Sequence, residues 1–475
     1  MDLEAIHRSL YPYAARYGVI REFPEEGLSR EAVLAQLAEM SREEDARWEG
    51  GKCSGTIYHG DHAHYAFLTE CFGMFNHTNA LQRDMCPSMS RFESEIIAMT
   101  LDMLHADAVR EHDPANTPCG VLGSGGTESI LNAMLAYRNL ANERGVARPQ
   151  MIWPDTAHPA FTKAAHMFGM EVVVAPTDPG TTQVDVDFVR DHADERTAVV
   201  IASAGNYPYG TIDPIGALSD LVLEKGTYLH VDGCLGGWIL PWGQDLGYPN
   251  IPVFDFRLPG VTSISADTHK YGYGLKGTSV LTWRDTSLRR HHYFVQADWK
   301  GGLYASPGLA GSRSGGLIAA TWAAMVSLGK RGYHDRARAI FETAFAMQDA
   351  VTSHPELRLI GAPTFCFSFT SPVLDIYHVN DAMAARGWRF NGQQRPDALH
   401  MAVTGPQLQP GVVESFAADL SAAVDYASTP GLGQPKSAAL YGVGAGAGIE
   451  APPRDAIPGL VTMFLDAITD GPPPP

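Results

Sequence analysis

Lys270 lies in a setting that suits a reacting amine. It ends the segment Ser263–Lys270, which begins as a buried-looking strand and ends in the polar string Asp-Thr-His-Lys. In α/β proteins, ligands bind beyond the carboxyl ends of the strands, where this lysine would lie. Burial there would lower the pKa of the amine and make its neutral form available for a Schiff base. The segment therefore predicts covalent chemistry on a lysine.

Two further segments could act together with Lys270. Tyr228–Asp232 is a second predicted strand, and it ends in a carboxylate that can keep a proton on a pyridine nitrogen. Gly120–Ser129 places glycine, serine and threonine directly before a helical stripe, where backbone N–H groups can bind a phosphate. Each feature alone has a simpler explanation, such as a solvated lysine or a tight turn. Together, a lysine, an acidic partner and a phosphate loop predict a site for pyridoxal 5'-phosphate.

Three other motifs do not predict a further cofactor or metal site. Gly272–Gly277 matches the dinucleotide pattern G-x-G-x-x-G, but a predicted strand rather than a helix follows it, which argues against a Rossmann site. His59–His64 contains three histidines, yet the spacing of the other histidines offers no further metal ligand, so we expect no metal site. Gly442–Gly448 follows no predicted strand and is expected to be a flexible loop.

Composition excludes several classes of protein. The 475 residues carry a net charge of −18, which disfavours binding to nucleic acid or to anionic lipid. The six cysteines form no C-x-x-C pair and are expected to be reduced thiols of a cytoplasmic enzyme. The N-terminus lacks the features of a signal peptide, and no apolar run is long enough to predict a transmembrane segment.

The elements that must position these residues predict an α/β fold. Residues 1–54 are expected to form an N-terminal helical arm, and a helix is expected to begin at Ser90 with Ser90 and Glu93 as a capping box. Residues 55–325 are expected to form a large domain with a mostly parallel sheet. Its predicted strands are Glu171–Ala175, Thr197–Ala202, Tyr228–Asp232, Val261–Ala266 and Thr278–Trp283.

The C-terminal part predicts a smaller α+β domain. Leu317–Phe345 is expected to be a long helix that leads into residues 326–470. Strands are expected in Leu357–Thr370 and Ala398–Thr404, and helices over Val373–Arg386 and Val412–Ala427. Residues 471–475 are expected to be a disordered tail, since four of these five are proline.

Three motifs carry a resemblance to a known family. Ser124–Ser129, His230–Gly237 and Ser265–Tyr273 resemble the corresponding segments of sphingosine-1-phosphate lyases, which belong to the group II decarboxylase-like pyridoxal-phosphate enzymes of fold type I. The resemblance runs from about Tyr58 to Tyr441, and its lysine motif is highly specific. It implies a large cofactor-binding domain with a mostly parallel sheet and a smaller C-terminal domain.

The resemblance also implies roles for individual residues. Lys270 would hold the cofactor as a Schiff base, and Asp232 would bind the pyridine nitrogen. The cofactor phosphate would be held by Gly126, Thr127 and His269, while His158 would stack on the ring. A loop with Gly311 and Ser312 reaches the neighbouring subunit in this family, which implies a homodimer with shared active sites. The substrate pocket would include Tyr58, Asn79, Gln82, Lys276 and Tyr441.

The reaction implied is a retro-aldol cleavage of a long-chain base phosphate to a fatty aldehyde and phosphoethanolamine. The group that takes the C3 hydroxyl proton stays open among the cofactor phosphate, Tyr58, Tyr441 and Lys276. One position departs from the family, because Gln82 stands where a histidine is typical, although Arg83 could supply the missing charge. The alternatives are an aldolase for unphosphorylated β-hydroxy amines, an amino-acid decarboxylase and a non-catalytic relative.

Overall fold

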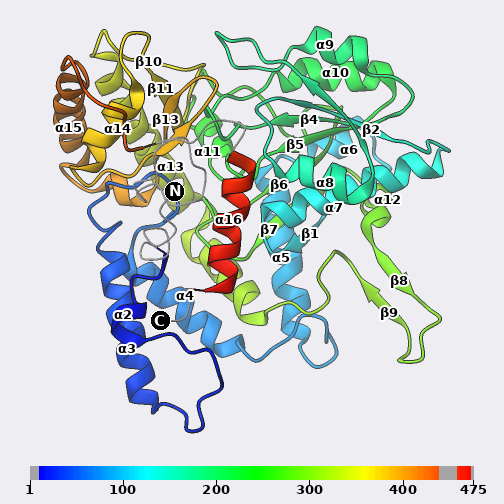
Figure 1. Cartoon of the computed structure of the whole chain (residues 1–475). Coiled ribbons are helices and arrows are strands. Elements are labelled where there is room, and N and C mark those ends of the chain that lie inside the picture. Colours follow the sequence, from blue (N-terminus) through cyan, green and yellow to red (C-terminus); the bar gives the residue numbers. More distant parts are fainter. Residues whose placement is uncertain (1–9, 438–456, 472–475) are drawn as a thin grey trace.

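The computed structural model describes residues 10–437 and 457–471 of the chain. Tyr441, the Gly442–Gly448 loop and the last four residues of the predicted tail therefore lie outside the described residues. Figure 1 shows a large sheet with helices packed on it, a smaller sheet beside it, and helical segments from both ends of the chain.

A seven-stranded sheet forms the centre of the large part. Its spatial order is β1-β7-β6-β5-β4-β2-β3, and β7 alone among these strands runs against its two neighbours, so the predicted mostly parallel sheet is confirmed. The five predicted strands are present to within one residue at each end. The first two strands, β1 and β2, were not predicted. The bounds are β1 Cys119–Gly123, β2 Gln150–Pro154, β3 Glu171–Ala175, β4 Thr197–Ser203, β5 Leu229–Asp232, β6 Val261–Ala266 and β7 Ser279–Trp283.

Both faces of this sheet are covered. Along β4, Val200 and Ala202 join one apolar cluster while Val199 and Ile201 join another, as expected where successive side chains point to opposite faces. Both clusters are buried, and this is why the strands read as continuous apolar runs. The helices of the large part are α5 Pro87–Met103, α6 Ala108–His112, α7 Gly126–Glu143, α8 Ala160–Phe168, α9 Val186–His192, α10 Ile215–Lys225, α11 Leu240–Asp245 and α12 Thr286–Arg289.

The predicted start of the helix at Ser90 is wrong. Helix α5 begins at Pro87, after Cys86, and no side chain caps its N-terminus. Proline suits the first helical position because its fixed φ matches the helix and its missing N–H is not needed there. Ser90 is therefore inside the helix, and Glu93 forms ion pairs instead of a capping box.

The smaller sheet lies beyond a long helix. Helix α13, Gly315–Thr352, includes the predicted Leu317–Phe345 and is interrupted at Gly329, whose positive φ of 58° is not helical. The four antiparallel strands have the order β10-β11-β13-β12, of which β12 was not predicted. Their bounds, with those of the two covering helices, are β10 Arg358–Leu359, β11 Cys366–Thr370, β12 Asn391–Gln393, β13 Ala398–Ala402, α14 Ile376–Ala384 and α15 Val412–Ala427. The domain limits stay a prediction.

The two ends of the described chain meet. The hydroxyl of Tyr11 donates to the carbonyl oxygens of Ala467 and Ile468, at 2.7 and 2.9 Å. These carbonyls belong to α16, Ile457–Asp470, and the other helices near the N-terminus are α2 Ala14–Tyr17, α3 Arg30–Asp45 and α4 His62–Phe75. A hairpin of β8 Phe294–Gln296 and β9 Tyr304–Ser306 projects from the large part (Figure 1). Among the described helices, none is long and apolar enough to cross a membrane.

Candidate active site

Lys270 follows the carboxyl end of β6, as predicted. The turn that carries it is held on several sides. The hydroxyl of Tyr333 donates to the carbonyl oxygen of Gly272 at 2.8 Å, and the hydroxyl of Tyr271 donates to that of Val403 at 2.7 Å. The N–H of Lys270 itself donates to the carbonyl oxygen of Asp267 at 3.1 Å. The backbone beneath the amine is therefore tied to helix α13 and to the residue that follows β13.

The charge state of Lys270 differs from the prediction. Its Nζ lies 2.9 Å from Oδ2 of Asp267, a buried carboxylate three residues earlier. Burial works to lower the pKa of Lys270, but the carboxylate of Asp267 outweighs burial and holds that pKa above its ordinary value. The expectation of a lowered pKa is thus wrong for the chain without its cofactor, because it took no account of Asp267.

Asp232 ends β5, the strand next to β6. Its Oδ1 accepts hydrogen bonds from the N–H of Cys234 at 3.0 Å and from the hydroxyl of Ser265 at 3.2 Å. Burial would raise the pKa of Asp232, but nearby His158 and the bonds from Cys234 lower it below its usual range. The carboxylate is therefore fixed in orientation and stays ionised at neutral pH, as a partner for a protonated ring nitrogen must be.

The predicted phosphate loop lies against the lysine turn. Helix α7 begins at Gly126 without a side-chain cap, so its first N–H groups stay available to a phosphate. A Cβ at Gly126 would lie 2.8 Å from Oδ2 of Asp267 and from Sγ of Cys234, and a Cβ at Gly125 would lie 3.3 Å from the ring of His269. Only glycine fits this close approach. Thr127 is exposed in the first turn of the helix.

His158 comes from a third strand end. It follows β2, and its Nδ1 accepts a hydrogen bond from the N–H of Ala160 at 3.2 Å. Burial lowers the pKa of His158, while the charge of Asp232 works against this and that of Lys270 adds to it. Its electrostatic partners therefore include the two residues that the cofactor would need, and the neutral ring can lie against an aromatic system.

These groups fit pyridoxal phosphate. Asp267 Oδ1 is buried without a hydrogen-bond partner in the described chain, so the site holds an unsatisfied acceptor beside the amine of Lys270. An uncapped helix N-terminus, a buried carboxylate and a lysine converge there from the ends of β1, β5 and β6. Cys234 is buried in the same place, and burial raises the pKa of its thiol well above the usual value, which favours a packing role over that of a nucleophile.

Tyr58 and Lys276 meet beside this site. Nζ of Lys276 lies 4.4 Å from the ring centroid of Tyr58, and that ring packs edge-on against Tyr271 at 5.1 Å. Burial and the charge of Lys270 lower the pKa of Lys276 to about 8, although Asp267 opposes them. A cavity of about 130 Å³ opens between the segments that carry Tyr58 and Lys276, and its lining also includes Tyr65, Tyr273 and Leu275.

Asn79 and Ser312 lie together. Nδ2 of Asn79 donates to the hydroxyl of Ser312 at 2.9 Å, and its Oδ1 accepts from the N–H of Arg313 at 3.2 Å. Ser312 and Gln82 are exposed. Within the described residues, neither Asn79 nor Ser312 hydrogen-bonds to Lys270 or Asp232. The structure thus joins Asn79 to the Gly311–Gly315 loop rather than to the lysine turn of its own chain.

Arg83 is held by a carboxylate of its own chain, and its contact with a substrate stays a prediction. Its guanidinium forms an ion pair with Glu93, a buried residue of α5, and Arg313 pairs with the same carboxylate. The two guanidinium groups share one carboxylate, so the cluster keeps a net positive charge. The sequence alone did not reveal the contacts of Glu93 and Asp267. Glu93 matched a capping box with Ser90, and Asp267 was read only as part of the motif that ends at Lys270.

The histidine motif builds no metal centre in the described chain. The rings of His59 and His64 stack with centroids 3.6 Å apart, and Arg336 lies 3.3 Å from Nδ1 of His59. Burial, with the charges of Arg336 and His64, lowers the pKa of His59 to about 2. No group of three metal-ligating side chains occurs among the residues that the structure describes.

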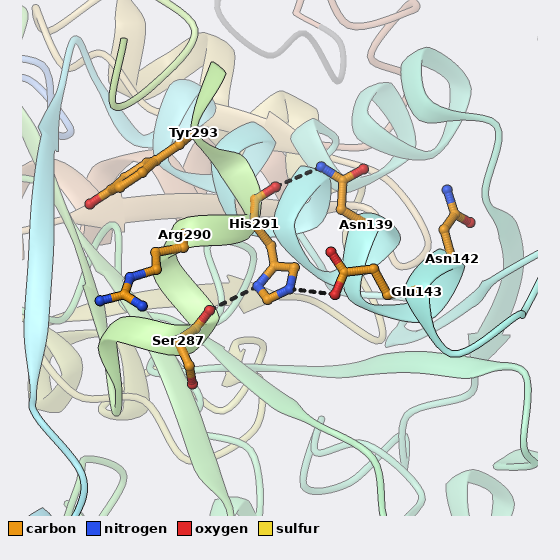
Figure 2. A pocket seen from close by; sticks show the side chains of 7 residues that line it. All are labelled: Asn139, Asn142, Glu143, Ser287, Arg290, His291 and Tyr293. Carbon is orange, nitrogen blue, oxygen red and sulfur yellow. Dashed lines mark hydrogen bonds and ion pairs between the residues drawn. The ribbon is translucent and has the colours of Figure 1, made fainter. Parts of the chain in front are cut away.

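Figure 2 shows a second pocket, open and polar, at the far end of α7 from the phosphate loop. His291 projects into it and is held by two neighbours, since its Nδ1 lies 2.8 Å from the carbonyl oxygen of Ser287 and its Nε2 lies 3.0 Å from Glu143. Asn139 donates to the carbonyl oxygen of His291 at 2.6 Å. These pairings satisfy the polar groups at the centre of the pocket, and it contains none of the candidate site residues.

The fold and the site define a class of protein. The pattern of the "Pyridoxal-dependent decarboxylase conserved domain" matches residues 21–369, which is most of the chain. A glutamate decarboxylase of Lactobacillus brevis shares the fold, with a TM-score of 0.73 at 18% identity over 88% of this chain and 98% of that one. The chain is therefore a pyridoxal-phosphate-dependent enzyme with the fold type I architecture.

Closer relatives narrow the class. A solved sphingosine-1-phosphate lyase of Burkholderia pseudomallei is 62% identical, has a TM-score of 0.91 and covers 97% of this chain and 100% of its own. The sphingosine-1-phosphate lyase of Arabidopsis thaliana is 40% identical over 94% of this chain and 80% of its own length. A probable one of Legionella pneumophila is 33% identical over 85% and 70%. The chain belongs to the sphingosine-1-phosphate lyase family.

Proposed function

We propose that this enzyme cleaves the C2–C3 bond of phosphorylated long-chain bases such as sphingosine-1-phosphate, giving a fatty aldehyde and phosphoethanolamine. The observation that carries the proposal is the convergence of Lys270, Asp232 and the loop before α7, in a chain 62% identical to a bacterial lyase of that name. Lys270 holds the cofactor, Asp232 binds its ring nitrogen, Gly126, Thr127 and His269 bind its phosphate, and His158 lies against its ring.

The cofactor, when bound, accepts the electron pair of the cleaved bond. Asp232 supports this by staying ionised, since a carboxylate beside the ring nitrogen keeps a proton there. Asp267 holds the amine of Lys270 at 2.9 Å and so orients it toward the cofactor. The turn around Gly272, held by the hydroxyl of Tyr333, would keep the amine in place to hold the cofactor.

Lys276 and Tyr58 handle the proton of the C3 hydroxyl. A pKa near 8 leaves a useful fraction of neutral amine on Lys276 at neutral pH, and general bases work best when their pKa lies near the working pH. Tyr58 lies against this amine and can orient the hydroxyl that loses the proton. Tyr441 keeps its proposed place in the substrate pocket on the resemblance alone.

The active enzyme is a two-fold homodimer in which Asn79, Gln82 and Ser312 serve the partner's site. Ser312 is exposed and bonded to Asn79 rather than to the lysine turn of its own chain. Large apolar side chains are exposed on parts of the chain that a second copy would cover. They are Phe67 and Met74 of α4, Leu81 and Met85 of the following turn, and Phe294, Val295, Trp299 and Leu303 of the hairpin.

A second substrate class also has structural support. Gln82 is neutral and Arg83 is held by Glu93, so position 82 itself offers no cation to a phosphate. The lack of a cation at position 82 would weaken the binding of an unphosphorylated β-hydroxy amine less than that of a phosphorylated one.

The enzyme works in the cytoplasm. All six cysteines are free of disulfide bonds in the structure, and Sγ of Cys234 lies 3.2 Å from the hydroxyl of Ser265. A reducing compartment keeps such thiols free. Labelling of the thiols in intact cells by a permeant but not by an impermeant reagent would support this, and equal labelling by both would contradict it.

The central experiment is incubation of the purified holoenzyme with sphingosine-1-phosphate, sphingosine and a panel of amino acids. We expect long-chain aldehyde from the first, less from the second, and no carbon dioxide from the third. Lys270→Ala is the inactive control. Carbon dioxide without aldehyde would replace the proposal by amino-acid decarboxylation.

A further inference from the structure

Glu93 connects the two segments that are proposed to reach the partner's site. Its side chain is 9% exposed on α5, and its carboxylate pairs with Arg83 and Arg313. Arg83 follows Asn79 and Gln82 in the chain, while Arg313 follows Ser312 directly. A buried carboxylate is costly unless it is paired, so both guanidinium groups are drawn to a defined place on α5.

The two segments form one hydrogen-bonded unit. The N–H of Ala80 donates to the carbonyl oxygen of Arg313, and the N–H of Gly315 donates to that of Thr78, both at 3.0 Å. The bond between Asn79 and Ser312 joins residues 233 positions apart in the sequence. These contacts fix the segments to each other, and they involve two buried residues, Ala80 and Gly315, the second of which begins α13.

The Glu93 contacts tie the two guanidinium groups to α5. Helix α5 spans 17 residues and buries Phe92, Ile96 and Met103 in the core, so the carboxylate stands on a rigid element. Arg313 also donates to the carbonyl oxygen of Leu122 in β1 at 3.2 Å. Loss of Glu93 would leave two guanidinium groups close together without their shared anion, and they would repel each other.

We propose that Glu93 is a positioning residue for the active site of the partner subunit. Through Arg83 and Arg313 it holds Asn79, Gln82 and Ser312 where they meet the cofactor phosphate and the substrate of the other chain. This inference rests on the shared-site dimer proposed above. A displacement of about 1 Å in such groups can cost on the order of 10²-fold in rate.

Hybrid dimers separate this role from a role in the subunit's own fold. Two differently tagged chains are co-expressed and the mixed dimer is purified, with Lys270→Ala in one chain. The one reacting site then uses Lys270 of the other chain and takes Ser312 from the Lys270→Ala chain. Glu93→Gln is placed first on the Lys270→Ala chain and then on the other, and aldehyde release from sphingosine-1-phosphate is measured.

We expect a loss of about 10- to 100-fold when Glu93→Gln is on the Lys270→Ala chain, and less than about two-fold when it is on the other. Glu93→Asp, which keeps the charge, should recover part of the loss. Equal losses in the two placements would overturn the inference, because a structural defect of the mutated subunit does not depend on which chain holds Lys270. Should Glu93→Gln fail to fold, Arg83→Gln removes one of the two ties and is tested in the same placements.

Two controls complete the design. Asp102 is on the same helix as Glu93, and Asp102→Asn breaks its exposed ion pair with Lys330 of α13. This substitution should be neutral in both placements. Ser312→Asp should be harmful on the Lys270→Ala chain alone. If Ser312→Asp shows no dependence on placement, the shared-site dimer fails and the inference fails with it. If the effect of Ser312→Asp depends on placement and the effect of Glu93→Gln does not, only the role of Glu93 is refuted.

Discussion

Restoring a histidine at position 82 should improve the use of phosphorylated substrates. Gln82 is exposed in the turn proposed to reach the partner's site, and Glu93 engages the neighbouring charge of Arg83. Gln82 can therefore offer only a neutral hydrogen bond. Bonds to a charged group contribute about 1.5–3 kcal/mol, against about 0.5–1.5 kcal/mol for neutral pairs, so Gln82→His should gain about 1 kcal/mol. That corresponds to about a five-fold increase in kcat/KM.

The pH dependence follows from the charge on the new side chain. A histidine is protonated below its ordinary pKa of about 6.5, and a phosphate beside it raises that value. The gain should therefore be full at pH 6 and should fall as the pH rises through the pKa of the bound imidazolium. The assay is kcat/KM for sphingosine-1-phosphate and for sphingosine across this range, with Gln82→Asn as a neutral control.

The two substrates separate the possible outcomes. We expect the gain with sphingosine-1-phosphate and almost none with sphingosine. An equal gain with both would refute a contact between residue 82 and the phosphate. If the unchanged enzyme prefers sphingosine and Gln82→His reverses this preference, the natural substrate is an unphosphorylated β-hydroxy amine.

Three further substitutions test the proposed site. Lys270→Ala should abolish the visible absorbance of the bound cofactor and its bleaching by borohydride, and a reducible adduct that persists would refute the role of Lys270. Asp232→Asn should remove a transition-state interaction of about 3–5 kcal/mol and slow turnover by about 10²–10⁴-fold, so near-normal turnover would reduce the aspartate to a structural role. Because Lys276 must be neutral to act as a base, kcat/KM should rise with pH through about 8, and Lys276→Met should remove this limb of the profile and about 10²–10⁴-fold of the activity. A limb that survives in Lys276→Met would assign the proton transfer to another group.

The strands could be predicted where composition favours them. β3, β4 and β6 are rich in valine, isoleucine and threonine, and they lie where the apolar runs place them. The sequence Cys-Gly-Val-Leu-Gly of β1 has two glycines and one β-branched residue, so its strand depends on pairing with β7 rather than on propensity. The start of α5 was missed because Ser90 and Glu93 match a capping box, while Pro87 sets the real first turn.

A site residue could be predicted where a single sequence motif contains it and gives its place in the fold. Lys270, Asp232 and Gly126 each stand at the end of a strand or the start of a helix, and parallel strands bring such ends together. The charge state of Lys270 was not predictable from burial, because it depends on whether the carboxylate of Asp267 faces the amine or the solvent. Glu93 could not be assigned, since its two partners come from segments that meet only in the folded chain.

The pairing of the Asn79 turn with the Ser312 loop has a consequence for specificity. Because Asn79 bonds directly to Ser312, and Glu93 holds both neighbouring arginines, the residues proposed to meet the substrate phosphate and the cofactor phosphate move as one body. A substitution at Gln82 changes the chemistry of this body without moving it, whereas one at Glu93 moves it without changing the groups it presents. The first should therefore act on discrimination between substrates, and the second on turnover of every substrate alike. Substrate preference in this enzyme is thus adjustable at the exposed turn while the cofactor contacts stay fixed by the buried carboxylate of α5.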